Sequence, residues 1–218
     1  MAANPVPIFS SSLRLQFPAP ILEGISMIKR LLLPMLAALA LSSTAHAALN
    51  EGDAAPSFDA QASLAGKAFH YSLPDALKKG TVVVYFYPSA FTGGCNLQAH
   101  TFALNQDKFT AAGATIIGVS LDSIARLNDF SADPEYCGGK IPVASDPGGK
   151  IAKSYALNIR AGSAGKKDTR GVEIDHDFAE RTTFIVTPDG KVSSVIGGVA
   201  PEANVAAALE KVQQLAKK

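Results

Sequence analysis

Cys95 is the residue whose place in the sequence best suits chemistry. An apolar run at residues 82–84 predicts a buried strand, and a short loop ending in Gly93 and Gly94 separates that strand from Cys95 at the start of a predicted helix. The positive end of a helix dipole favours thiolate over thiol, and the thiolate is the nucleophile. The position therefore predicts an exposed, readily ionised sulfur that does redox chemistry. The alternative is an inert core cysteine, since free cysteines are often buried.

The loop before Cys95 carries the pattern Pro-x-x-x-Thr-x-x-Cys, formed by Pro88, Thr92 and Cys95. This pattern resembles the active-site signature of the peroxiredoxins, the alkyl hydroperoxide reductase and thiol-specific antioxidant type. The resemblance extends from about residue 51 to residue 218 and also rests on the run at 181–186 and on the order of elements. It implies a thioredoxin-like α/β fold, with one domain and a central mixed sheet flanked by helices. It also implies a thiol-dependent peroxidase that reduces hydrogen peroxide and small organic hydroperoxides.

Four positions can supply what peroxide reduction requires: an ionised sulfur, two oxygens in line with it, and stabilisation of the leaving oxygen. Cys95 would be the sulfur, and the Thr92 hydroxyl can accept from N–H groups at the helix start and donate to sulfur or peroxide. Arg181 opens a β-rich run, and its permanent charge can bind thiolate and peroxide together. Pro88 would fix the loop and exclude water, while the N–H groups of Gly94 and Cys95 would add donors.

The resemblance assigns these same roles to these four side chains, and each also has a plainer interpretation. Arg181 could be a solvated charge at a strand end, Thr92 an ordinary helix cap and Pro88 an ordinary loop proline.

Cys137 is the other cysteine of the chain, in a turn-rich segment that we expect to be mobile. In the bacterioferritin-comigratory subgroup that the chain most resembles, a resolving cysteine often follows five residues after the first, where this chain has His100. The placement of Cys137 is more like that of the thiol peroxidase subgroup. The resemblance thus implies a catalytic Cys95–Cys137 disulfide, formed after the helix start opens at Gly93 and Gly94. A static disulfide and a free thiol remain alternatives.

Periodicity predicts alternating strands and helices, as expected for a parallel βαβ unit followed by a hairpin and a closing helix. The expected strands cover residues 69–73, 81–87, 114–120, 141–146, 181–187 and 192–196. The expected helices cover residues 74–79, 94–111, 123–131, 150–157 and 201–216. Residues 158–180 are polar and contain glycine, so we expect an exposed loop there.

The N-terminus has the three regions of a secretory signal peptide over residues 27–47: a basic start, an apolar stretch at 31–41 and the small-x-small site Ala45-His46-Ala47. We expect cleavage near Ala47, a periplasmic location and a peroxiredoxin domain over 48–218. Residues 1–26 fit none of the three regions and read as a non-native upstream extension. The alternative is a retained amphipathic anchor.

Other features narrow the function. The net charge of +1 gives no reason to expect nucleic-acid binding. No haem, flavin or nucleotide motif is present, so we expect thiol-only chemistry without a cofactor or metal. Cys95-Asn96-Leu97-Gln98 is not a C-x-x-C pair, which argues against a thioredoxin-type oxidoreductase. Asp175-His176-Asp177 is expected to be a solvated loop.

The expected partners are a peroxide, a thioredoxin-like or small-thiol reductant and, at most, a second copy in a weak homodimer. We expect no stable membrane association after signal cleavage. Two other functions stay open: thiol-disulfide exchange on exported proteins, and a redox-sensing binding domain without turnover.

Overall fold

The computed structural model describes residues 49–217. The expected extension at 1–26 and signal peptide at 27–47 lie outside these residues, so both stay predictions. Within the described part, no helix is both long and apolar enough to cross a membrane.

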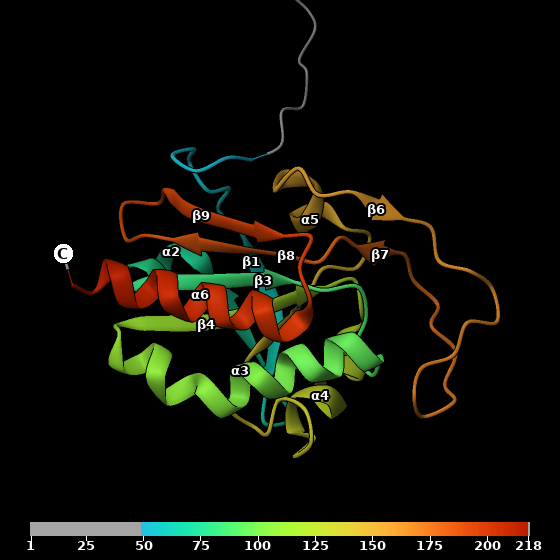
Figure 1. The fold of residues 1–218 in the computed structure, drawn as a ribbon. Helices are drawn as coiled ribbons and strands as arrows, with labels where there is room; N and C mark the ends of the chain where they lie inside the picture. The colour runs from blue at the N-terminus through green and yellow to red at the C-terminus, as the bar shows by residue number, and fades with distance from the viewer. Residues whose placement is uncertain (1–48, 218) are drawn as a thin grey trace, which may run out of the picture. The chain divides into compact units, whose positions relative to one another are not determined.

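A seven-stranded mixed sheet forms the centre of the described unit, in the order β2-β1-β5-β4-β3-β8-β9 (Figure 1). Its strands are β1 (Asp59–Leu64), β2 (Lys67–Ser72), β3 (Thr81–Phe86), β4 (Ala114–Ser120), β5 (Val143–Ser145), β8 (Thr182–Val186) and β9 (Val192–Gly197). The neighbours β3, β4 and β5 run parallel, whereas β8 pairs antiparallel with β3. The predicted thioredoxin-like arrangement is confirmed.

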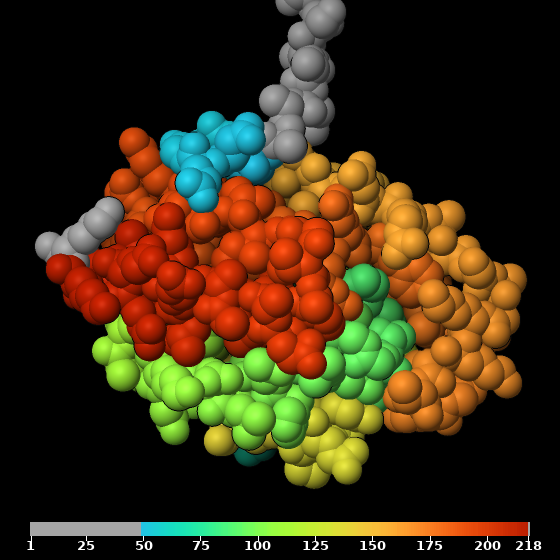
Figure 2. Space-filling model, viewed as in Figure 1, coloured from blue at the N-terminus to red at the C-terminus, as the bar shows by residue number. Residues whose placement is uncertain are grey.

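Helices cover both faces of the sheet. Their bounds are α2 (Leu73–Leu77), α3 (Gly93–Ala111), α4 (Ile124–Ala132), α5 (Lys150–Ser154) and α6 (Pro201–Leu215). Side chains of α3, α4 and α6 pack in one core cluster, and those of α2 and α5 pack in the other. Figure 2 shows α6 and α3 side by side on the surface of the first layer.

Strand β3 divides its side chains between the two cores. Val83 and Tyr85 belong to the core that contains α3, while Val82, Val84 and Phe86 belong to the opposite core. Successive strand residues point to opposite faces, so an all-apolar strand is buried on both sides. This strand ends directly before Tyr87 and Pro88, so a rigid element fixes the start of the loop that carries the predicted site.

The structure corrects two sequence predictions. Strand β1 was not predicted, because its sequence DAQASL is mostly small and polar and is ordered by pairing with β2 and β5. The segment 158–180 is not simply an exposed loop. It begins and ends in the paired strands β6 (Ile159–Arg160) and β7 (Phe178–Ala179), and it buries Ile174 and Asp168.

Candidate active site

Cys95 lies in the first turn of α3, as predicted, but it is buried. Only 2% of the residue is exposed, and it packs in the core cluster below α3. The prediction of an exposed cysteine is therefore wrong. The reason is tertiary: Arg181 and α6 cover the helix start from the neighbouring part of the sheet.

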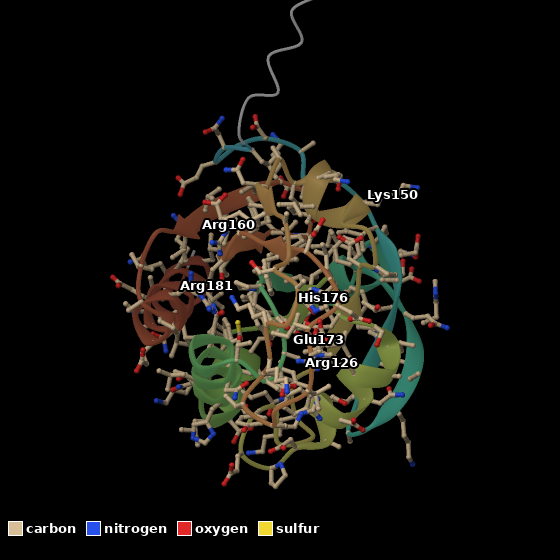
Figure 3. The ribbon with its side chains drawn as sticks, turned by 90° about the vertical axis from the view of Figure 1, so that its right-hand side faces the viewer. Arg126, Lys150, Arg160, Glu173, His176 and Arg181 are labelled. Carbon is tan, nitrogen blue, oxygen red and sulfur yellow. The ribbon has the colours of Figure 1, made fainter. Side chains whose placement is uncertain are left out.

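Arg181 directly precedes β8, and its guanidinium reaches the sulfur across the β3–β8 pair. Its Nη2 donates to Cys95 Sγ at 3.3 Å, and its Nη1 donates to Gln98 Oε1. Figure 3 labels Arg181 among the side chains on this side of the molecule. A Cβ at Gly94 would lie 3.2 Å from Nη2, so glycine leaves the guanidinium room. The expectation that Arg181 is a cation near Cys95 is met, and the solvated-charge interpretation is not.

Gln98 and Asn204 are site residues that the sequence analysis missed. Gln98 Nε2 donates to Asn204 Oδ1 at 3.0 Å, and Thr183 Oγ1 donates to the same oxygen at 2.6 Å. Asn204 Nδ2 in turn donates to the carbonyl of Ile196 at 3.0 Å. These fully buried side chains hold Arg181 through α3, α6 and β8. A polar residue three positions after Cys95 on the same helix face was the available signal.

Thr92 is the N-cap residue of α3, but its hydroxyl does not cap the helix. Its Oγ1 donates to the carbonyl of Ser89 at 2.8 Å, which leaves lone pairs on the oxygen to accept from a ligand. The N–H of Cys95 is also engaged, donating to the carbonyl of Thr92 at 2.9 Å. The prediction that the Thr92 hydroxyl caps the helix is wrong, and so is the prediction that the Cys95 N–H is free to bind a ligand. Both groups donate to carbonyl groups within the turn instead.

Pro88 is half-buried and lines a cavity of about 490 Å³ together with Arg181. The remaining lining residues are Asn158, Arg160, Ala179 and Glu180. Pro88 and Arg181 thus border the same cavity, and through it a small ligand can approach the Arg181 guanidinium.

Cys137 does not lie in an exposed, loosely held segment. It is fully buried, and its turn is closed by backbone hydrogen bonds from Gly138 to Asp133 and from Gly139 to Ser131. Burial, assisted by the negative charge of Asp133, raises the pKa of the Cys137 thiol well above its ordinary value. Both cysteines are free thiols in this structure. The static disulfide is therefore not present.

The two cysteines nevertheless share one environment. Both belong to the same core cluster, and both sulfurs lie near enough to the buried Tyr85 phenol to raise its pKa, after burial as the main cause. A hollow of about 520 Å³ is bordered by Asn96 and Leu97, next to Cys95, and by Tyr136, next to Cys137. His100 also lines this hollow. It stands five residues after Cys95, where related proteins often have a resolving cysteine.

The segment Asp175-His176-Asp177 departs from the prediction of a solvated loop at one residue. His176 is mostly buried, and its Nε2 lies 2.8 Å from the carboxylate of the buried Asp122. Among residues 49–217, no cluster of three or more His, Cys, Asp and Glu side chains could hold a metal ion.

Comparison with known proteins agrees with this geometry. The AhpC/TSA family profile matches residues 51–195. Peroxiredoxin Q from the chloroplast of Populus jackii is 32% identical over 70% of this chain and 66% of its own length. Peroxiredoxin Bcp of Xanthomonas campestris is 29% identical over 56% of this chain and 76% of its own length.

A similar fold occurs in the crystal structure of peroxidoxin BcpB from Mycobacterium tuberculosis. The TM-score is 0.63 at 26% identity, over 77% of this chain and 98% of that one. With a cysteine at the start of α3, an arginine on its sulfur and this match over most of the described residues, the chain belongs to the AhpC/TSA family and is a peroxiredoxin of the Bcp group, a thiol-dependent peroxidase.

Proposed function

We propose that Cys95 is the peroxidatic residue of this peroxidase. The observation that carries the proposal is the 3.3 Å contact between Arg181 Nη2 and Cys95 Sγ at the start of a 19-residue helix. The thiolate attacks one oxygen of the peroxide, the O–O bond breaks, and the other oxygen leaves as water or an alcohol after taking up a proton. Sulfur is oxidised to sulfenic acid while the peroxide is reduced.

Arg181 and Thr92 are the groups placed to assist this step. The guanidinium stabilises the thiolate and can turn its remaining donors toward the peroxide. Thr92 Oγ1 has its hydrogen directed to Ser89, so it is oriented to accept a hydrogen bond from the peroxide OH. Pro88 and Arg181 line the cavity from which the substrate approaches.

Cys137 is proposed as the resolving residue. Its thiol attacks the sulfur of the sulfenic acid, water leaves, and a Cys95–Cys137 disulfide forms. A shared core cluster and a hollow bordered by the sequence neighbours of both cysteines support this pairing. Because both sulfurs are buried, the first turn of α3 and the Cys137 turn must open. Gly93 and Gly94 lower the cost of opening α3, since each glycine destabilises a helix by about 1 kcal/mol relative to alanine.

The cycle then needs a dithiol or small-thiol reductant to reduce the disulfide. Peroxiredoxins use thioredoxin-type reductants, and we propose one of that class here. The signal-like pattern at 27–47 supports a periplasmic location for this reaction, and the protein is proposed to act as a monomer or weak homodimer.

Intact mass spectrometry tests the scheme. The reduced protein receives one equivalent of hydrogen peroxide and is quenched within seconds, in parallel with the Cys137→Ser variant. We expect the parent to lose two hydrogens as the disulfide forms, and the variant to gain one oxygen at Cys95.

The Cys95→Ser variant is the matched control and should show neither change. An unchanged mass in the parent would contradict the peroxidatic role of Cys95. A gain of oxygen in the parent without loss of hydrogens would keep that role but exclude Cys137 as the resolving residue.

A further inference from the structure

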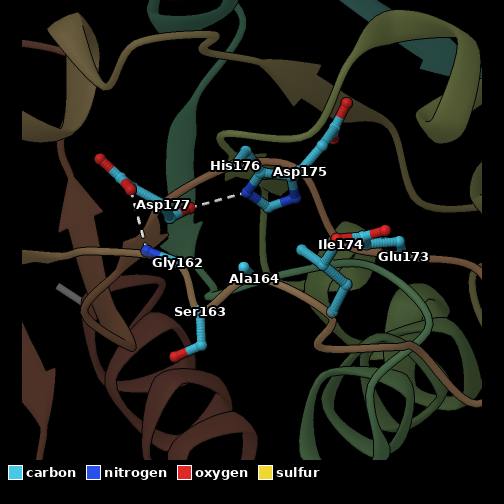
Figure 4. Close-up of a pocket in the computed structure, with 8 residues that line it drawn as sticks. All are labelled: Gly162, Ser163, Ala164, Glu173, Ile174, Asp175, His176 and Asp177. Carbon is cyan, nitrogen blue, oxygen red and sulfur yellow. Dashed lines mark hydrogen bonds between the residues drawn. The ribbon is translucent and has the colours of Figure 1, made fainter.

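The segment between the paired strands β6 and β7, residues 161–177, forms a long loop (Figure 1); we call it the strap, and its Thr169 contacts the turn that precedes Cys95. It encloses a small cavity of about 210 Å³ whose lining contains neither Cys95 nor Arg181 (Figure 4). The N–H of Gly162 donates to Asp177 Oδ1 at 2.9 Å, which ties the two ends of the strap together. Several of its other contacts reach the turn at Ser89–Thr92.

Thr169 of the strap holds the backbone of that turn directly. Its N–H and its Oγ1 both donate to the carbonyl of Phe91, at 2.8 and 2.9 Å. Phe91 has a φ of 58°, in the left-handed region that bulky residues rarely occupy. Such a conformation costs about 1–3 kcal/mol and persists only where the surroundings over-determine it. The strap is a large part of those surroundings, and the strained residue directly precedes Thr92.

Two arginines hold the turn at Phe91, one at the Phe91 ring and the other at the carbonyl of the preceding residue. The Arg170 guanidinium lies 3.3 Å from the centre of the Phe91 ring, and Arg126 Nη2 donates to the carbonyl of Ala90 at 2.9 Å. Asp168 of the strap binds both arginines, at 3.1 Å and 2.8 Å. The strap thereby orients a cation of its own and a cation of α4 onto the turn.

His176 connects the strap to Asp122, the buried carboxylate that holds the other side of the turn. Asp122 Oδ2 accepts from the N–H of Ala90 at 2.8 Å, and Oδ1 accepts from Arg126 Nε at 2.7 Å. His176 Nε2 lies 2.8 Å from Asp122 Oδ1, and Nδ1 lies 2.7 Å from the carbonyl of Asp177. Nε2 also lies 3.3 Å from Ser89 Oγ. Because the carboxylate and the carbonyl oxygen only accept, the imidazolium form, in which both ring nitrogens donate, satisfies both of these short contacts.

The Asp122 carboxylate beside His176 favours that form, whereas the charge of Arg126 opposes it. Asp122 and Arg126 face it from the β4–α4 region, Asp175 and Asp177 flank it on the strap, and Asp168 lies beyond Arg126. Burial by itself would lower the pKa of His176, but the hydrogen bond and charge of Asp122 raise it above its ordinary value of 6.5. The contact is therefore fully formed below about pH 6.5 and is lost as the pH rises through the raised pKa.

We propose that His176 is a positioning residue for the peroxide reaction: as an imidazolium it docks the strap on Asp122, and the docked strap holds the Phe91 turn that places Thr92 and Cys95. Loss of the His176 proton removes one donor, and the strap then holds the turn less firmly. The reaction of Cys95 thus depends on the protonation of a side chain that touches neither sulfur nor peroxide. This inference rests on the peroxidatic role of Cys95 proposed above.

The test compares the parent with His176→Ala and His176→Gln, all in the Cys137→Ser background, which isolates the first oxidation. The rate of oxygen addition to Cys95 is measured by rapid quench and intact mass at pH 6 and pH 9. We expect His176→Ala to react about tenfold more slowly than the parent at pH 6, because misplaced reacting groups lose rate steeply. The ratio of the two rates should be smaller at pH 9 than at pH 6, because the neutral imidazole keeps only one of its two N–H donors.

The glutamine variant keeps a neutral donor for Asp122 at every pH. We expect it to recover most of the rate and to hold the same advantage over His176→Ala at pH 6 and pH 9. Taking ratios at each pH cancels the ionisation of Cys95 itself. His70→Gln is the matched control, since His70 lies on β2 beside Asp59 with its side chain 72% exposed, and its rate should equal that of the parent.

Thr169→Val supplies a second variant in case His176→Ala fails to fold. It removes the Oγ1 donor but keeps the N–H bond to Phe91, and we expect a loss of about fivefold, the equivalent of one neutral hydrogen bond. A parent-to-His176→Ala ratio of one, or one that is the same at pH 6 and pH 9, overturns the proposal. A parent whose Cys95 does not react at either pH instead overturns the proposed function.

Discussion

Cys95 and Cys137 are two buried thiols in one core cluster, yet their surroundings differ in charge. Cys95 lies at the start of α3 with a guanidinium donor at 3.3 Å. Cys137 is fully buried, and this burial, together with the negative charge of Asp133, raises the pKa of its thiol. Burial therefore does not decide reactivity here. The two sulfurs differ because a cation and a helix start lie next to Cys95 and activate it, whereas Cys137 must move before it can react.

Removing the cation should have the largest effect on this difference. Arg181→Met takes away the donor to Cys95 and the donor to Gln98 Oε1. We expect the oxidation of Cys95 by peroxide to slow by about 10²–10³-fold, the range found when one preorganised donor to a reacting centre is lost. The oxidation rate of Arg181→Lys should fall between those of the parent and Arg181→Met, because lysine keeps the charge but not the two-pronged contact.

Arg160→Met is the control for that measurement. Arg160 lines the same cavity as Arg181 and is exposed, so its loss should change the rate by less than about twofold if contact with the sulfur is what matters. Equal effects at Arg160 and Arg181 would show that general positive potential, and not the contact, activates Cys95.

Thiol labelling would sharpen the same comparison without peroxide. With iodoacetamide at pH 7 and peptide mass analysis, we expect Cys95 to be modified at least about tenfold faster than Cys137, because the thiolate is the reactive form. Low, non-denaturing urea should accelerate the labelling of Cys137 more than that of Cys95, because backbone hydrogen bonds close the Cys137 turn while two glycines already weaken the first turn of α3. Equal labelling rates without urea would contradict the distinction between the two sulfurs.

Tyr85 belongs to the same core cluster as both cysteines, and its substitution has the smallest expected effect. Its ring stacks on Phe102 at 4.5 Å over Gly118, where a Cβ would lie only 2.6 Å from the ring. Among the described residues its buried hydroxyl has no hydrogen-bond partner. Tyr85→Phe should therefore leave the free energy of unfolding of the reduced protein unchanged or raise it by about 1 kcal/mol.

Tyr155→Phe is the matched control in the opposite core. The Tyr155 hydroxyl donates to the carbonyl of Pro56 at 3.0 Å, so its loss should lower the free energy of unfolding by about 1 kcal/mol in urea titration. A comparable loss in Tyr85→Phe would mean that the Tyr85 hydroxyl is bonded in solution.

Strong local patterns made most of the fold predictable. The mostly apolar strands β3 and β4 and the helix at 93–111 lie within one residue of the predicted bounds, because each is specified by its own residues. Strand β1 was missed because its six residues carry little apolar signal. Its order comes from two neighbouring strands far along the chain, which local patterns do not record.

The site divides in the same way. The spacing of Pro88, Thr92 and Cys95 could be recognised in the sequence because the three residues lie on one loop. Arg181 could be identified through its place before a β-rich run and through the family resemblance. Gln98 and Asn204 were not, since each is unremarkable until α3 and α6 bring them into contact. The burial of Cys95 and the direction of the Thr92 hydroxyl were mispredicted because Arg181 and Ser89 decide them.

The sequence by itself determined the order of elements and which residues stand at the helix start, because strand and helix periods and a turn before a helix are properties of neighbouring residues. Only the tertiary structure decided which cation reaches Cys95, that Cys137 is buried, and that the strap of residues 161–177 rests on the Phe91 turn. These depend on contacts between segments up to 86 positions apart. Such contacts are selected by the packing of the whole core, and no short stretch of residues specifies them.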